Sequence, residues 1–147
     1  MKLIISPVNQ PDSNKLDTAY ELREDFRIVY KGNYLRVPKF FQFDGASIPR
    51  FAHSIIGTPF NPLFMEAAVV HDWLYHTHQI SKKEADKLFY ELLIKNGISK
   101  IKAKTMHKAV AWFGSSYWKN DKEDLKYLER LRTKLKENYK VPKFYGF

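Results

Sequence analysis

The sequence predicts an α+β fold, with a small antiparallel β-sheet at the N-terminus followed by a helical subdomain built on an antiparallel helix pair. From residue 19 to residue 43, aromatic and β-branched residues alternate with charged ones, which is typical of half-buried strands. After residue 46, apolar residues recur every three or four positions, which is typical of helices with one buried face. We therefore expect a single domain over residues 1–147, mainly β over 1–46 and mainly α over 47–147.

The strand region contains one clear turn. Residues 31–33 read lysine-glycine-asparagine and separate the predicted strands at 26–30 and 34–37. Pro38 then interrupts the strand pattern, because proline cannot donate a ladder hydrogen bond. Asp44 and the glycine after it mark the end of the sheet.

The helical region holds clear start and stop signals. One helix should run from about Pro62 to Thr77, and the next should begin with a capping box at Ser81. Further helices should begin at Ser99 and Asp121. The residues expected to face inward in these last two helices are Ile101, Met106, Val110 and Phe113, and Leu125, Leu128, Leu131 and Leu135.

Composition excludes several classes of protein. The chain has 147 residues, 44% of them hydrophobic, which suffices for a sizeable core. Cysteine is absent, which excludes disulfide bonds, thiolate zinc sites and a cysteine nucleophile. No apolar run approaches the roughly 20 residues of a membrane-spanning helix. The apolar stretch at the start is too short for a signal peptide, so we expect a protein that is not secreted by one.

The formal net charge of +9 favours anionic partners such as nucleic acid or acidic lipid surfaces. Most of the excess positive charge falls after residue 81, on predicted helices with lysine-rich faces. A basic face that contacts only solvent also explains the charge. No DNA- or RNA-binding motif accompanies it.

The stretch AAVVHDWLY at residues 67–75 places a histidine and a carboxylate inside an otherwise apolar helix. His71 and Tyr75 share one helix face because they are four residues apart. The short turn before Ser81 predicts that the next helix packs antiparallel, which brings Asp86 to the height of His71. Asp86 would then orient one ring nitrogen of His71 and leave the other as a base that faces water.

A structural explanation of the same residues stays open at this point. Buried histidine-aspartate pairs also serve as hydrogen bonds between helices, where they fix the register. Asp72, next to His71, would be available to a cation or to a hydrogen-bond donor. Spacing alone does not decide between a catalytic base and a tie between two helices.

The stretch FDGASIPR at residues 43–50 can be explained in two ways. Asp44 can close an Asx turn and Ser47 can cap a helix that starts with proline. The functional alternative makes Asp44, Ser47 and Arg50 substrate-binding residues in the same cleft as His71, with Arg50 holding an anionic group. No G-x-S-x-G elbow surrounds Ser47, so the sequence does not favour this residue as a nucleophile.

Over about residues 40–118 the chain resembles a phage and prophage family of unknown function. The resemblance is carried by D-G-A-S-I-P-R at 44–50, A-A-x-x-H-D-x-L-Y at 67–75, and the A-D pair at 85–86. It implies a bacteriophage protein that is located in the host cytoplasm or in the virion.

More distantly, the histidine motif and the following helix with its A-D pair resemble the phospholipase A2 superfamily, especially the cysteine-free domain of parvovirus capsid proteins. This resemblance implies that His71 is a general base, that Asp86 orients it and that Tyr75 supports the pair. It also implies a calcium ion, held by Asp72 and by backbone carbonyls around Gly57, that polarises an ester carbonyl. The glycine-rich calcium loop of that superfamily would correspond here to GTPFN, which has one glycine.

Three functions follow from these patterns. The first is a phage-encoded hydrolase-like protein with a His-Asp site that activates water, in a phospholipase A2-like and metal-assisted form. The second is a non-catalytic structural protein of the virion or tail, which would bind other virion proteins. The third is a basic accessory protein that binds nucleic acid.

Overall fold

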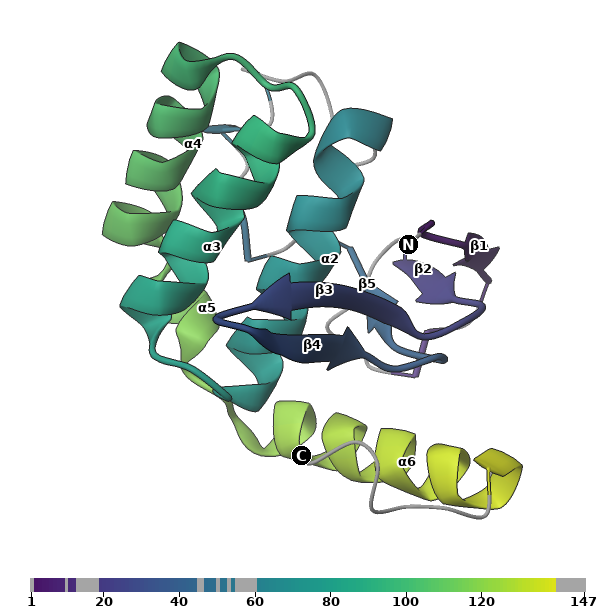
Figure 1. Cartoon of the computed structure of the whole chain (residues 1–147). Coiled ribbons are helices and arrows are strands. Elements are labelled where there is room, and N and C mark those ends of the chain that lie inside the picture. The colour runs from purple at the N-terminus through teal and green to yellow at the C-terminus, as the bar shows by residue number, and fades with distance from the viewer. Residues whose placement is uncertain are drawn as a thin grey trace. The chain divides into compact units, whose positions relative to one another are not determined.

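The computed structural model describes residues 2–9, 11–12, 19–44, 47–49, 51–52, 54 and 61–139 (Figure 1). The chain divides into two compact units, residues 1–44 with 121–147, and residues 45–120. Antiparallel strands occupy the N-terminal part and helices follow from residue 62, so the predicted α+β class is confirmed. The expectation of a single domain stays a prediction.

The first unit holds two antiparallel sheets. One has the strand order β1 (Ile5–Val8), β2 (Ala19–Leu22) and β5 (Gln42–Phe43), and the other pairs β3 (Phe26–Tyr30) with β4 (Asn33–Val37). Lys31 and Gly32 both have positive φ, at 49° and 77°, which is the geometry of a two-residue hairpin turn. The turn predicted at residues 31–33 is therefore confirmed.

Helix α6 (Lys122–Tyr139) belongs to the same unit as the strands. The backbone N–H of Gln42 in β5 donates a hydrogen bond of 2.7 Å to the hydroxyl of Tyr127. Leu125 was expected to face inward, but this prediction was wrong, because its side chain is exposed. The other three residues expected to face inward, Leu128, Leu131 and Leu135, are buried, together with Asp124 and Tyr127.

The second unit is helical, with α2 (Pro62–Thr77), α3 (Lys82–Lys95), α4 (Lys100–Phe113) and the short α5 (Ser115–Trp118). Helix α2 packs against α3, and α3 packs against α4 (Figure 1). Phe64, early in α2, contacts Phe89, late in α3, with ring centroids 5.6 Å apart. The later residue His71 contacts the earlier residue Asp86, so the two helices run antiparallel, as the sequence predicted.

Local signals explain where these helices begin and end. Asn61 caps α2 ahead of Pro62, and His78 ends that helix in a left-handed conformation. Ser81 begins α3 with a full capping box, in which its side chain and that of Glu84 each accept the other's backbone N–H. These caps fix the short turn that holds α2 against α3.

Helix α2 is buried on nearly all sides, because every residue from Ala67 to Tyr75 is buried. Helix α4 instead buries a narrow face of small and medium residues, including Ala103 and Met106. The inward positions expected for Ile101 and Phe113 were wrong, because both are exposed, Ile101 by 80%. Within the described ranges, no helix is both long enough and apolar enough to cross a membrane.

Ser81→Ala should lower the free energy of unfolding by about 1 kcal/mol, because it removes the side-chain acceptor at the first turn of α3. Urea unfolding followed by circular dichroism measures this change. Ser116→Ala, at an exposed position of α5, is the control and should stay within about 0.5 kcal/mol of the parent protein. An unchanged unfolding midpoint for Ser81→Ala would mean that the capping box does not hold α3.

Candidate functional site

A buried hydrogen bond joins His71 on α2 to Asp86 on α3. The distance from His71 Nε2 to Asp86 Oδ1 is 2.8 Å, and both side chains are almost wholly removed from solvent. The ring of His71 lies between two aromatic rings, with centroids 4.2 Å from Tyr75 and 4.7 Å from Phe89. The contact expected from the length of the turn is therefore present, in an environment with little water.

The carboxylate of Asp86 has two further donors. The Tyr75 hydroxyl donates to Oδ1 at 2.6 Å, and the Lys82 ammonium donates to Oδ2 at 2.8 Å. Lys82 also donates to the carbonyl oxygens of Val110 and Ala111, at 3.0 and 3.2 Å. Lys82 was not predicted from the sequence, although a lysine four residues before an aspartate on a helix is a recognisable pair.

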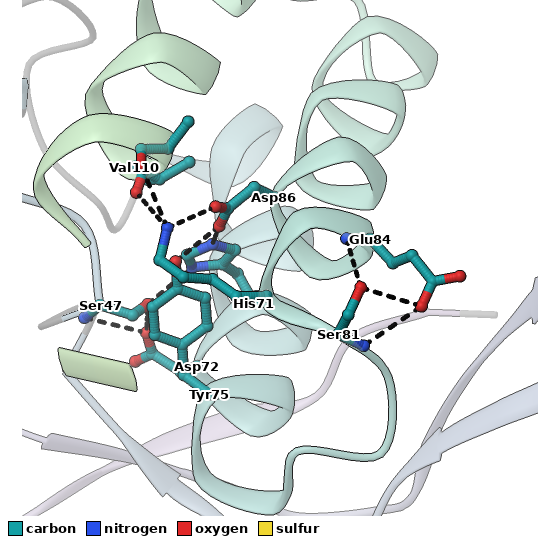
Figure 2. A network of polar contacts seen from close by, with 10 residues as sticks. Ser47, His71, Asp72, Tyr75, Ser81, Glu84, Asp86 and Val110 are labelled. Atoms are coloured by element: carbon teal, nitrogen blue, oxygen red, sulfur yellow. Dashed lines mark hydrogen bonds and ion pairs between the residues drawn. The ribbon is translucent and has the colours of Figure 1, made fainter. Parts of the chain in front are cut away.

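The other ring nitrogen of His71 meets a serine rather than open solvent (Figure 2). Ser47 Oγ lies 2.8 Å from His71 Nδ1. The Ser47 backbone N–H donates to Asp72 Oδ1 at 3.3 Å, and the Ser47 hydroxyl also contacts that carboxylate oxygen. The buried polar chain therefore runs from Asp86 through His71 and Ser47 to Asp72, entirely within the helical unit.

Burial and hydrogen bonding set the charges of these groups. Burial disfavours a charged ring and lowers the pKa of His71, although the bond to Asp86 acts in the opposite direction. Burial raises the pKa of Asp86, but the hydrogen bonds from His71, Lys82 and Tyr75 outweigh it and hold that pKa below its ordinary value. Burial and the bond to Asp86 raise the pKa of Tyr75. The network therefore contains an ionised Asp86, a neutral His71 and a neutral Tyr75.

These charges fix the tautomer of His71. Because ionised Asp86 only accepts, Nε2 must carry the proton of the neutral ring. Nδ1 is then a bare acceptor, and the Ser47 hydroxyl oxygen lies next to it. The one hydroxyl proton of Ser47 is donated to Asp72 Oδ1, which also accepts the Ser47 backbone N–H. The neutral site thus places a serine hydroxyl between an imidazole base and a carboxylate.

Three further residues proposed from the sequence stay predictions at this site. Asp44 follows β5, in the unit that holds the strands. Arg50 and Gly57 lie outside the described residues, so their expected roles in anion and calcium binding stay predictions. His71, Asp86, Tyr75, Asp72 and Ser47 are brought together.

The described residues do not by themselves fit a calcium ion. Calcium takes about six to eight oxygen ligands. Asp72 Oδ1 instead faces the N–H and hydroxyl of Ser47, which are donors. In the described parts of the chain, no group of three His, Cys, Asp or Glu side chains is placed to hold a metal ion.

Comparison with known families places the chain in a wider group of proteins. Residues 20–110 match a family described as "Protein of unknown function (DUF1353)". The chain belongs to this family. The matched part contains all the side chains of the network, which are Ser47, His71, Asp72, Tyr75, Lys82 and Asp86.

Two relatives come from Sinorhizobium fredii (strain NBRC 101917 / NGR234). The uncharacterized protein y4iH is 36% identical over 94 residues, which is 63% of this chain and 39% of the relative. The uncharacterized protein y4jT is 36% identical over 99 residues, which is 67% of this chain and 30% of the relative. The match thus spans well under half the length of these relatives. No solved structure gives a significant match.

Acidification should destabilise the protein through His71. A group whose pKa is lowered on folding stabilises the folded state above its ordinary pKa of 6.5, and that stabilisation is lost as the pH falls through the folded value. We expect the free energy of unfolding to decrease as the pH drops below 6.5. This pH range lies above the one in which carboxylates titrate. NMR titration of the ring nitrogens should show the Nε2–H tautomer at neutral pH.

His78→Gln is the matched control for this titration, because His78 lies outside the network and stacks on Trp118. The free energy of unfolding of His78→Gln should vary with pH as that of the parent protein does. In His71→Gln, the additional decrease in the free energy of unfolding below pH 6.5 should be absent. A proton on Nδ1 at neutral pH would contradict the assignment.

Gly114→Ala should disturb the support of Asp86. A β-carbon at Gly114 would come within 2.6 Å of the Tyr75 hydroxyl oxygen and closer still to the Val110 carbonyl oxygen. We expect a loss of about 1–3 kcal/mol in the free energy of unfolding, because the site is already filled. Tyr75→Phe tests the cause in a double-mutant cycle, since removing the hydroxyl should relieve part of the clash. Strictly additive effects would contradict the contact.

Proposed function

We propose that this protein is a hydrolase in which His71 acts as the general base and Asp86 orients it. The observation that carries the proposal is the chain of two 2.8 Å contacts, from Asp86 to one ring nitrogen and from the other nitrogen to a hydroxyl. A base held at one nitrogen and facing a hydroxyl at the other is the arrangement needed to remove a proton during attack on a carbonyl.

The charge state supports the same chemistry. A general base must be neutral before the reaction, and the lowered pKa of His71 keeps the ring neutral at neutral pH. Asp86 stays ionised and can stabilise the imidazolium that forms when the base takes a proton. Lys82 and Tyr75 hold the carboxylate in place, so that the ring orientation is maintained.

The finer form of this proposal is a phospholipase A2-like enzyme of phage or prophage origin, acting on phospholipid in the host cytoplasm or as part of the virion. The hydrogen bond from Tyr75 to Asp86 supports it, because the resemblance gives Tyr75 that supporting role. The calcium ion that this form includes would take Asp72 as one carboxylate ligand, and the other oxygens would have to come from outside the described residues.

A second candidate is a non-catalytic virion or tail protein in which the buried network only ties the helices together. Exposed aromatic side chains where α4 meets α5 favour it, because exposed apolar clusters often mark protein contacts. They are Trp112, Phe113 and Tyr117. On this alternative, His71→Ala changes stability without changing any turnover. Nucleic-acid binding stays a prediction.

His71→Ala should lower hydrolytic turnover by about 100-fold or more, because a positioned general base contributes about 10²–10⁴ to the rate. Asp86→Asn should lower it as well, by releasing the ring from its orientation. Release of fatty acid from phospholipid vesicles and release of p-nitrophenol from p-nitrophenyl esters measure the activity. Each assay is run with calcium and with a chelator.

The outcomes separate the forms of the proposal. Turnover of vesicles that needs calcium supports the phospholipase form, and turnover of simple esters in chelator supports a metal-independent hydrolase. His78→Gln should keep full activity, which controls for the loss of a histidine in the same unit. Equal turnover by the parent protein and folded His71→Ala would refute the proposal.

A further inference from the structure

We propose that Ser47 is the nucleophile of this site and forms a covalent acyl intermediate, an inference that rests on the proposed hydrolase function. The residues around Ser47 do not by themselves favour this role, because they lack the elbow motif of many serine hydrolases. The structure supplies the geometry instead. Ser47 Oγ, the imidazole of His71 and the carboxylate of Asp86 form a chain with two contacts of 2.8 Å.

This order of groups is that of a nucleophile, its base and the residue that orients the base. The ring is used in the opposite sense from the usual serine triad, because here Nδ1 faces the serine and Nε2 faces the carboxylate. Both nitrogens are chemically able to accept a proton from a hydroxyl. The distance from Ser47 Oγ to Nδ1 and the neutral charge of the His71 ring therefore both suit proton transfer from Ser47.

Asp72 positions the serine for this step. Its carboxylate accepts the Ser47 backbone N–H at 3.3 Å and so holds the loop residue against α2. The Ser47 hydroxyl also donates to this carboxylate, so its proton must turn from Asp72 to Nδ1 of His71 before transfer, while the backbone N–H keeps the residue anchored. Ser47 is 5% exposed, so an acyl donor reaches its oxygen only when neighbouring groups move aside, and small donors should react best.

The reaction balances with an ester as substrate. Ser47 Oγ bonds to the carbonyl carbon while its proton passes to Nδ1 of His71. The bond to the leaving alcohol then breaks, and the alcohol departs with that proton. Water gives a proton to the same nitrogen and attacks the acyl-serine, which releases the carboxylic acid and restores the Ser47 hydroxyl.

The first test is covalent labelling of the full chain. A fluorophosphonate with a short alkyl chain forms an Oγ–P bond with an activated serine and releases fluoride, and peptide mass spectrometry locates the adduct. We expect an adduct on Ser47 in the parent protein and a labelling rate about 100-fold lower in His71→Ala. Ser54 is the internal control, because it is an exposed serine that donates to a backbone carbonyl.

The second test uses the absence of cysteine from this chain. Ser47→Cys introduces a single thiol beside His71, and Ser54→Cys introduces one at the control position. A thiol that gives its proton to His71 should react with iodoacetamide well below the ordinary thiol pKa of about 8.5. The control thiol should titrate near that value. Adding His71→Ala to Ser47→Cys should abolish the difference.

The outcomes distinguish this inference from the proposed function. An adduct on Ser47 that depends on His71, together with an acidic thiol in Ser47→Cys, supports the nucleophile. Folded parent protein without a Ser47 adduct, under conditions that fully label a known serine hydrolase, overturns it, and so does a thiol of ordinary pKa. Hydrolysis that depends on His71 but persists in Ser47→Ala removes Ser47 as the nucleophile while the proposed function stands.

Discussion

The helical unit depends on one carboxylate, that of Asp86, which is buried on α3. A buried carboxylate without partners would cost several kcal/mol. Asp86 instead accepts hydrogen bonds from His71 and Tyr75 on α2 and from Lys82 on its own helix. Because two of these donors belong to α2, the contacts that offset the cost of burying the carboxylate also fix the position of α2 along the axis of α3. A slip of one turn in either helix would leave the carboxylate without them.

Lys82 contributes to the charge state of the network. Its ammonium group has three N–H donors, and they reach Asp86 and the carbonyl oxygens of Val110 and Ala111. The end of α4 is a favourable place for a cation, because its last carbonyls lack partners within the helix. Lys82 thus ties α3 to α4 and balances the charge of Asp86. A second positive charge, on His71, would be stabilised little by Asp86, because Lys82 already balances that carboxylate. Burial therefore keeps the ring neutral and able to act as a base.

Much of this arrangement could be predicted, because it depends on local signals. Capping residues and turn length gave the ends of α2 and α3, and the antiparallel pairing then placed His71 opposite Asp86. The faces of α4 and α6 were harder to predict. Ile101 and Leu125 fit an apolar spacing, but both side chains are exposed because they lie away from the faces that pack. Periodicity identifies a helix, whereas the buried face depends on neighbours that the pattern does not contain.

The sequence placed Ser47 in the same cleft as His71 only as an alternative to a helix cap, because the contact joins residues 24 positions apart and no spacing rule relates them. This contact also decides which chemistry the base can perform. A bare imidazole nitrogen has one lone pair, and the Ser47 oxygen, 2.8 Å from Nδ1, occupies the place from which a donor would reach it. Direct attack by water would therefore require Ser47 to move away from Nδ1 first. Attack by Ser47 requires only that its hydroxyl proton turn from Asp72 to Nδ1.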